Sequence, residues 1–114
     1  MRVLLADEIA AEGVEILKRT PGMAVEARGG ISGEELRSII GSYDALVVRS
    51  RTKVTAEIMQ AGTNLKVLGR AGVGVDNIDL DYATRRGIVV LNAPGGNVLS
   101  AAEHTFALLL ALVR

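Results

Sequence analysis

The sequence predicts an α/β fold built on a five-stranded parallel sheet, and three observations lead to this prediction. Five short apolar runs rich in Val, Leu and Ile recur along the chain, with helix-patterned segments between them. Hydrophobic residues make up 49% of the 114 residues but aromatic residues only 3%, which is typical of strands buried on both faces. No hairpin signal joins successive runs, so right-handed crossover connections are expected.

Each apolar run is assigned to a strand, and each intervening segment to a helix. The expected strands cover residues 2–6, 23–27, 44–48, 65–69 and 88–91, and the expected helices cover residues 9–19, 33–40, 56–60, 80–86 and 98–114. In the first half of the chain, Pro21 and Gly22 end the first helix. Ser32 and Glu35 form a capping box at the start of the second helix, which Gly41 ends.

The helices of the second half carry similar boundary signals. Thr55 is expected to cap the third helix and Gly62 to end it. Asp79 is expected to cap the fourth helix, and Gly87 follows its last turn. A second capping box, formed by Ser100 with the glutamate three residues later, predicts the start of the last helix.

The simplest arrangement of these elements is a flavodoxin-like three-layer fold with strand order 2-1-3-4-5. In this order the loops after strands three, four and five adjoin one another at the carboxyl edge of the sheet, where open α/β sheets bind ligands. Residues 1–97 are expected to form this domain, and residues 98–114 a separate apolar helix.

The composition excludes several classes of protein. Thirteen basic and thirteen acidic residues cancel, so no global charge favours nucleic acid or an anionic membrane as a partner. The chain has no cysteine and a single histidine, His104, which excludes disulfides, thiol catalysis and a multi-histidine metal site. An acidic metal site at Asp76, Asp79 and Asp81 lacks the alternating ligand spacing of a metal loop, so no metal is expected. No signal peptide precedes the first strand, and a cytoplasmic location is expected.

A glycine-rich stretch follows the fourth strand at residues 69–79. Gly72 and Gly74 lack Cβ atoms, so their amides can approach an anion closely and can adopt positive φ. Arg70 adds a forked charge, and the stretch is therefore interpreted as a carboxylate-binding loop. Its glycines do not fit the G-x-G-x-x-G spacing of a dinucleotide loop, and an ordinary turn is the competing interpretation.

A basic segment, residues 49–53, follows the third strand, with cations at every second position. These cations share one face if the segment is extended. Arg49, Lys53 and Arg70 could then converge on a doubly charged anion such as a phosphorylated acid. The alternative is a solvated charged surface. Asn92 and Asn97, in the loop after the fifth strand, are further candidate ligand contacts.

Four strings carry a resemblance to a known family: Val-Val-Arg-Ser at 47–50, Thr-Lys-Val-Thr at 52–55, Gly-Arg-Ala-Gly-Val-Gly-Val-Asp-Asn-Ile-Asp at 69–79, and Asn-Ala-Pro-Gly-Gly-Asn with Ser-Ala-Ala-Glu-His-Thr between 92 and 105. They resemble the D-isomer-specific 2-hydroxyacid dehydrogenases, and within that family the branch that acts on 3-phosphoglycerate. The resemblance implies the substrate-binding part of an enzyme that oxidises 3-phosphoglycerate with NAD, the first committed step of L-serine biosynthesis.

The resemblance also implies roles for individual residues. The expected substrate contacts are Arg49, Ser50, Lys53, Arg70, the amides of Ala71, Gly72 and Val73, and Asn92; the expected cofactor contacts are Val73 and Asn97. The family's dinucleotide fingerprint and its catalytic Arg, Glu and His lie beyond the matching segment. No catalytic residue is therefore expected here, and the isolated chain is expected to bind no NAD and to be inactive.

Alternatives remain open at this point. The parent could be another D-2-hydroxyacid dehydrogenase, and the chain alone could be a fragment without activity. A non-catalytic flavodoxin-like module is a further alternative, but a phospho-receiver would need an acceptor Asp where Arg49 stands and a Lys where Asn92 stands. A flavin-binding module would place a phosphate beside Asp7 and Glu8, which would repel it.

The apolar pattern of the last helix predicts that copies of the chain associate. Residues 106–113 form an unbroken apolar run, too short for a bilayer, which needs about 20 residues. A helix that is apolar all round is buried on more than one side. We expect one face to pack on the sheet and the other to pack against, or exchange with, a second copy in a homodimer or larger assembly.

Overall fold

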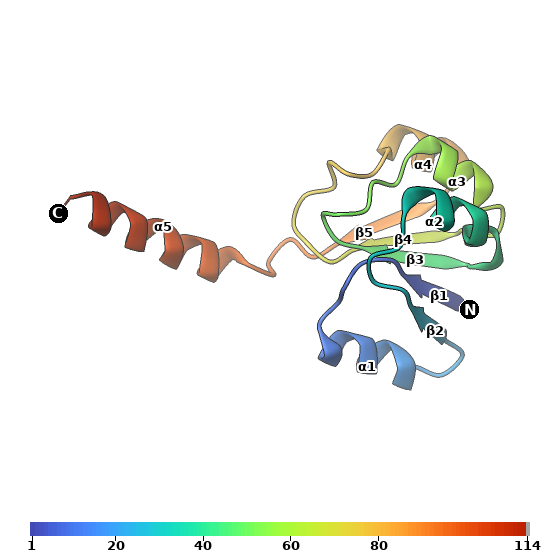
Figure 1. Ribbon diagram of the computed structural model, residues 1–114, viewed down its shortest axis with the longest axis horizontal. Coiled ribbons are helices and arrows are strands. Elements are labelled where there is room, and N and C mark those ends of the chain that lie inside the picture. The colour runs from blue at the N-terminus through green and yellow to red at the C-terminus, as the bar shows by residue number, and fades with distance from the viewer. Residues whose placement is uncertain (114) are drawn as a thin grey trace.

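The computed structural model describes residues 1–113 and shows a parallel sheet with helices on both faces (Figure 1). The strands are β1 (Arg2–Leu5), β2 (Ala24–Ala27), β3 (Ala45–Val48), β4 (Val67–Arg70) and β5 (Val89–Asn92). They lie in the order β2-β1-β3-β4-β5, and every neighbouring pair is parallel. The predicted fold class and strand order are both confirmed.

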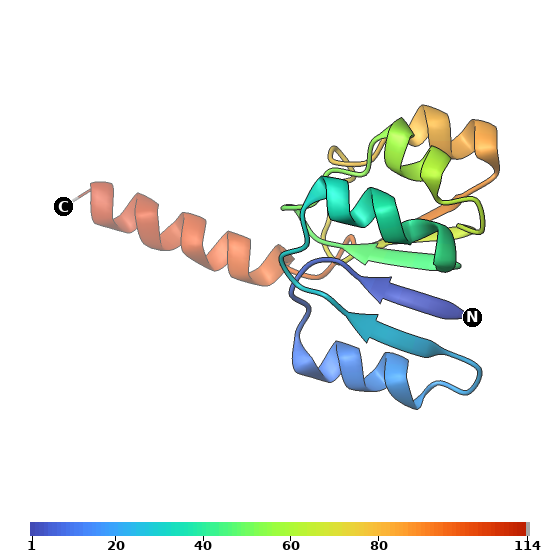
Figure 2. The ribbon, with the colours of Figure 1, turned by 45° about the vertical axis from the view of Figure 1, so that its right-hand side comes forward.

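The helices are α1 (Ala11–Arg19), α2 (Gly33–Ile39), α3 (Ala56–Ala61), α4 (Leu80–Arg86) and α5 (Val98–Leu112), with a short 3-10 helix η1 (Ile40–Ser42) after α2. Helices α2, α3 and α4 cover one face of the sheet, and α1 lies on the other (Figures 1 and 2). The chain moves across the sheet in one direction from β1 to β2 and in the opposite direction afterwards. Right-handed crossovers therefore place α1 on the opposite face from the next three helices.

Most of the predicted helix boundaries are confirmed by their capping contacts. The amides of Glu35, Ile58 and Tyr82 donate to the side chains of Ser32, Thr55 and Asp79 at 3.2, 3.4 and 2.9 Å. Gly87 ends α4 with a φ of 69°, a left-handed conformation that favours glycine. The last helix begins at Val98, where its expected range begins, but its N-cap residue is Asn97. Ser100 lies inside the first turn, so the predicted capping box at Ser100 is wrong.

The main core lies between the sheet and helices α2, α3 and α4. The strand register places Leu4, Leu46 and Leu68 in one row across the sheet, and all three are fully buried. Leu36 of α2 and Met59 of α3 close over this row and are equally buried. A parallel sheet needs such cover because both faces of its strands are apolar.

The opposite face of the sheet is covered along one side only. Val3, Leu5 and Ala45 are buried on this face with the help of α1. The register continues the same rows to Val89 and Leu91 of β5, whose side chains are 53% and 56% exposed. The apolar surface of β5 on this face is therefore open.

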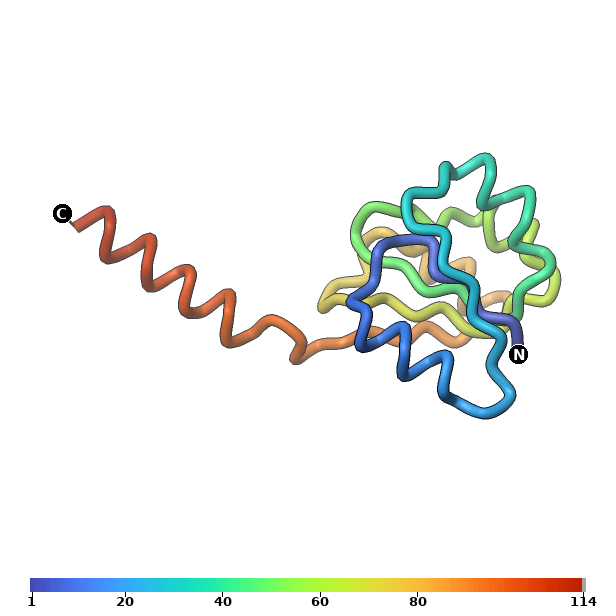
Figure 3. The backbone as a smooth tube through the Cα atoms, turned by 60° about the horizontal axis from the view of Figure 1, so that its bottom comes forward, coloured from blue at the N-terminus to red at the C-terminus, as the bar shows by residue number. Residues whose placement is uncertain are grey.

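Helix α5 extends away from the sheet, as the views in Figures 1 and 3 agree. None of its described residues is buried, and Leu108, Leu110 and Leu112 are 53%, 68% and 83% exposed. The expectation that one face of this helix packs on the sheet is wrong for the described residues, because the helix stands clear of the sheet. His104 is exposed on the same helix, so it has no place in a core. No helix within residues 1–113 has the length and apolar character needed to cross a membrane.

Candidate anion-binding site

The loops after β3, β4 and β5 enclose a cleft of about 530 Å³ at the carboxyl edge of the sheet. Its described lining residues are Arg49, Ser50, Arg70, Ala71, Gly72, Val73, Gly74, Ala93, Gly96 and Asn97. Parallel strands β3, β4 and β5 are adjacent, so their carboxyl ends bring these loops together. The cleft therefore gathers most of the residues that the sequence selected, including two arginines.

Arg70 turns back over the glycine loop. Its Nη1 donates a hydrogen bond to the carbonyl of Gly74, and a Cβ atom at Gly72 would lie 2.7 Å from the same nitrogen. A side chain at position 72 would therefore force the guanidinium of Arg70 to move away from the backbone that it now passes over. The positive φ expected for the loop is not observed, since the described positive-φ glycines are Gly22, Gly30 and Gly87.

The backbone amides of the glycine loop are only partly free. The amide of Ala71 donates to Val48 and that of Gly72 donates to Arg70, both at 2.9 Å, so these two amides hold the loop together. Within residues 1–113 the amides of Val73 and Gly74 have no backbone carbonyl as a partner. The part of the expected amide cradle that can face a ligand thus begins at Val73, whose side chain is 43% exposed.

Two of the expected contact residues lie outside the cleft lining. The side-chain Nδ2 of Asn92 donates to the backbone carbonyl of Val73 at 2.7 Å, so Asn92 braces the glycine loop from β5. Lys53 lines two other clefts and does not join Arg49 and Arg70. Of the three cations expected to converge, Arg49 and Arg70 line the same cleft and Lys53 does not.

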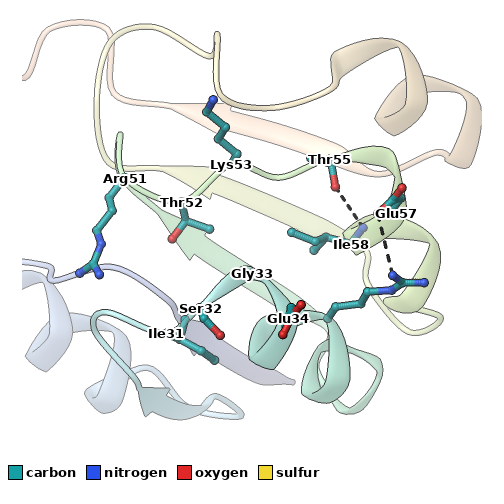
Figure 4. Close-up of a pocket in the computed structure, with 11 residues that line it drawn as sticks. Ile31, Ser32, Gly33, Glu34, Arg51, Thr52, Lys53, Thr55, Glu57 and Ile58 are labelled. Atoms are coloured by element: carbon teal, nitrogen blue, oxygen red, sulfur yellow. Dashed lines mark hydrogen bonds and ion pairs between the residues drawn. The ribbon is translucent and has the colours of Figure 1, made fainter.

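A larger cleft of about 630 Å³ lies between the starts of α2 and α3 (Figure 4). Its cations do not converge, because Arg51 and Lys53 point in opposite directions from the same loop (Figure 4). The basic residues of this loop thus do not share one face. Arg37 instead approaches Glu57 across the cleft at 3.9 Å, and the charges of this pair compensate each other. This cleft offers no focused charge to a ligand.

Sequence reasoning missed a buried polar group beneath the basic loop. Asp7 follows β1 and is only 5% exposed. Its Oδ2 accepts hydrogen bonds from the amides of Arg49 at 2.7 Å and Thr52 at 3.2 Å, and its Oδ1 accepts from the Thr52 hydroxyl at 2.6 Å. On the sequence alone Asp7 is only a charge that would repel a phosphate, yet its carboxylate organises the loop. The order of strands β1 and β3, which places their ends side by side, is the signal that could have identified it.

These contacts decide the charge state of Asp7. Burial by itself raises the pKa of a carboxyl group, but the hydrogen bonds from Thr52 and from the amide of Arg49, together with the nearby Arg51, outweigh it. The pKa of Asp7 therefore lies below its ordinary value, and the group is a carboxylate at neutral pH.

The cleft can bind and orient an anion, but its described lining contains no Asp, Glu, His or Lys that could take a proton from a substrate hydroxyl. A nicotinamide cofactor would accept the hydride of such a substrate when bound. The described residues do not fit the whole of this cofactor, since Gly69, Gly72 and Gly74 lack the spacing of a dinucleotide loop. Val73 and Asn97 are the two expected cofactor contacts, and both line the cleft.

The fold and the cleft together define a class, the flavodoxin-like domain with a cleft lined by arginines at the carboxyl edge of its sheet. Residues 3–112 match the family model of the D-isomer specific 2-hydroxyacid dehydrogenase catalytic domain, and the chain belongs to this family. It is 55% identical over 114 residues to the D-3-phosphoglycerate dehydrogenase of Archaeoglobus fulgidus, and this match covers 100% of the chain and 21% of the relative.

Two further relatives agree with this assignment. The D-3-phosphoglycerate dehydrogenase of Synechocystis sp. is 51% identical over 113 residues, covering 99% of this chain and 20% of that protein. The NAD⁺-bound 3-phosphoglycerate dehydrogenase structure from Entamoeba histolytica superimposes with a TM-score of 0.83 at 30% identity, covering 94% of this chain and 37% of that one. The chain thus spans about a fifth of the length of the curated relatives it matches.

Proposed function

We propose that this chain is the substrate-binding part of an NAD-dependent D-3-phosphoglycerate dehydrogenase, which oxidises the 2-hydroxyl of 3-phosphoglycerate. The observation that carries the proposal is the placement of Arg49 and Arg70 on the same cleft beside the glycine loop. Two guanidinium groups suit a substrate that carries both a carboxylate and a phosphate. The names of the curated relatives support this choice of substrate.

Arg70 supports the proposal in a second way. Its Nε is buried and has no hydrogen-bond partner within residues 1–113. A buried donor left unsatisfied costs free energy, so a movement of the guanidinium toward a ligand would sacrifice no hydrogen bond at Nε. The chain therefore holds a cation at the glycine loop whose hydrogen-bonding capacity is not used up by the fold.

One observation favours a second candidate, a D-2-hydroxyacid that carries no phosphate. Lys53 was one of the three cations that favoured a phosphorylated acid, and it lies outside the cleft. A smaller acid would need fewer cations, so the substrate of another member of the family is the alternative. The substrate-binding set of the proposal is therefore centred on Arg49, Ser50, Arg70 and the loop 71–73, with Asn92 as the brace of that loop.

The chain by itself is proposed to be inactive. Oxidation of an alcohol requires a base for the hydroxyl proton and a bound hydride acceptor, and the described cleft residues offer neither. Val73 and Asn97 would contact the nicotinamide end of NAD in the parent enzyme, but two contacts are too few to hold a dinucleotide. This chain alone is therefore expected to show no turnover in the presence of NAD.

A homodimer formed through α5 is the second part of the proposal. Phe106 and four nearby leucines of this helix are all at least 53% exposed: Leu108, Leu109, Leu110 and Leu112. A contiguous exposed apolar surface of this kind marks a site of interaction with another protein surface. Burying about 400 Å² of it at roughly 25 cal/mol per Å² would supply on the order of 10 kcal/mol before the costs of association.

Calorimetric titration of the purified chain tests the site. We expect 3-phosphoglycerate to bind more tightly than glycerate or inorganic phosphate, and NAD to show no measurable heat. Replacing Arg49 by Ala should weaken 3-phosphoglycerate binding roughly tenfold to a hundredfold, since charge-assisted contacts contribute about 1.5–3 kcal/mol. Equal affinities for 3-phosphoglycerate and glycerate would favour the unphosphorylated substrate, and NADH production would refute the proposed inactivity.

Two further variants calibrate this result. Arg37→Ala removes the same charge from the cleft between α2 and α3, so it should leave the affinity unchanged. Lys53→Ala decides whether this lysine contributes from outside the arginine cleft. An unchanged affinity of Arg49→Ala, with an unchanged melting temperature, would remove Arg49 from the site.

A further inference from the structure

The segment 49–52, which carries Arg49 and Ser50 into the cleft, is held from two sides by side chains distant in sequence. Asp7 accepts from the amides at both ends of the segment, those of Arg49 and Thr52. The side-chain Nδ2 of Asn77 donates to the backbone carbonyls of the same two residues, at 2.6 and 2.7 Å. Both the N–H and the C=O groups of Arg49 and Thr52 are thus fixed by side chains.

We propose that Asp7 and Asn77 are positioning residues, which hold the segment 49–52 in the conformation that presents Arg49 and Ser50 to the anion. This inference rests on the proposed function, because it presumes that the arginine cleft binds the substrate. Neither side chain lines that cleft. They act through the backbone of the segment, and the loop geometry in turn sets where the guanidinium of Arg49 can reach.

The surroundings of the two side chains support a role beyond ordinary packing. Asp7 is an acidic group in contact with the segment that borders the proposed anion site, and its charge alone would oppose binding there. Its three accepted hydrogen bonds come from the segment that carries Arg49. The backbone amide of Val54 donates to the carbonyl of Asn77 at 2.8 Å, and the amide of Asp79 donates to the carbonyl of Val54 at 3.1 Å. These two hydrogen bonds fix the backbone of Asn77.

The direction in which one substitution changes the affinity for the anion separates a positioning role from an electrostatic role. Asp7→Ala removes a negative charge near the bound anion, so a purely electrostatic role predicts tighter binding. Positioning predicts the opposite, a loss of roughly tenfold, because the segment loses three hydrogen bonds and Arg49 becomes mobile. Asp7→Asn should restore most of the affinity, since an amide oxygen can accept from both backbone N–H groups and its NH₂ can donate to the Thr52 hydroxyl.

The chain offers matched controls at the opposite edge of the sheet. The carboxylate of Asp44 accepts a hydrogen bond from the backbone amide of Arg2 at 2.7 Å. The side-chain Nδ2 of Asn64 donates to the backbone carbonyl of Gly41 at 2.8 Å. Asp44→Ala and Asn64→Ala therefore remove the same chemical groups far from the cleft, and each removes one hydrogen bond to the backbone. They should lower the melting temperature without changing the affinity for 3-phosphoglycerate.

Calorimetric titration of 3-phosphoglycerate into the full chain tests the inference. We expect Asp7→Ala and Asn77→Ala each to weaken binding about tenfold and the controls to have no effect. If Asp7 acts through Arg49, the double variant Asp7→Ala with Arg49→Ala should bind no more weakly than Arg49→Ala alone. If Asp7→Ala does not fold, Asn77→Ala and Thr52→Val carry the same test, because each loosens the same segment.

The outcomes are distinguishable. Binding by the wild-type chain that is weakened by Arg49→Ala but unaffected by Asp7→Ala and Asn77→Ala would overturn the positioning role and leave the proposed function intact. Tighter binding by Asp7→Ala would likewise overturn it. No binding by the wild-type chain, or no effect of Arg49→Ala, would overturn the anion site itself and the positioning role with it.

Discussion

The two faces of the sheet use the same kinds of apolar side chain and reach different degrees of burial. On the face under α2, α3 and α4, the row formed by Leu4, Leu46 and Leu68 is fully buried, and Val90 of β5 continues it as a partly buried residue. On the face that carries α1, the neighbouring row ends at Leu91, which is 56% exposed. Strand residues alternate between the faces, so the two rows differ by one position along each strand. The comparison shows that the helices above a strand decide its burial, because the strand patterns themselves are alike.

Helix α5 sharpens this comparison. It is the most apolar helix of the chain, yet it extends away from the face that lacks cover (Figure 1). The described residues therefore present two open apolar surfaces, one on β5 and one on α5. Exposed apolar surfaces of this kind mark interaction sites or aggregation sites, which makes the state of association the property most sensitive to substitution here.

The largest difference between the faces is expected from truncation of matched leucines on adjacent strands. Leu68→Ala should lower the free energy of unfolding by about 2–5 kcal/mol, because it leaves a cavity in the covered core. Leu91→Ala should lower it by less than about 1 kcal/mol, because the side chain is already half exposed. Urea denaturation followed by circular dichroism measures both. Equal losses would show that β5 is covered in solution.

A charge on α5 tests whether its surface is buried between copies. Leu110→Glu should weaken self-association at least tenfold, because a carboxylate would have to enter an apolar interface. Ser100→Glu adds the same charge in the first turn of the helix and should have little effect. Light scattering over a range of protein concentrations reports the mass. A wild-type chain that remains monomeric at high concentration would refute the proposed dimer.

Acidification should destabilise the fold by protonating Asp7, which braces a loop at the carboxyl edge of the sheet. The folded-state pKa of Asp7 lies below that of the unfolded chain, about 3.9, so its stabilising effect is present above that pH. The effect is lost as the pH falls through the folded-state pKa. The free energy of unfolding should therefore decrease between about pH 4 and the folded-state pKa, and Asp7→Asn should show a shallower decrease. Parallel slopes for the two chains would contradict the depressed pKa.

The smallest effect is expected for a hydroxyl on the open face. Val89→Thr should change the free energy of unfolding by no more than about 0.5 kcal/mol, because Val89 is 53% exposed and the hydroxyl stays hydrated. Val48→Thr makes the same change on the covered face, where Val48 is fully buried, and should cost roughly 1–3 kcal/mol. Thermal unfolding of the two variants gives the comparison directly.

Local signals explain why so much of the fold was predictable from the sequence. Caps such as Ser32, Thr55 and Asp79 act on amides three residues away, and Gly87 meets a steric requirement within its own backbone. Apolar runs separated by helical segments also suffice to predict a parallel sheet and its strand order. Once strands β3, β4 and β5 are adjacent, the meeting of their loops follows, and with it the shared cleft of Arg49 and Arg70.

The tertiary structure alone decided the features that depend on contacts between distant residues. Asp7 meets Arg49 across 42 residues and Asn77 meets it across 28, and no local pattern encodes either contact. The direction of Lys53, the passage of Arg70 over Gly72 and the exposure of α5 likewise depend on how a loop or helix leaves the sheet. The sequence by itself determined the elements, most of their caps and the edge of the sheet where the arginine cleft lies, because these follow from backbone sterics, short-range hydrogen bonds and chain connectivity. Which side chains brace that edge and which apolar surface stays open were decided by packing in three dimensions, where the partners of a residue are set by the whole chain.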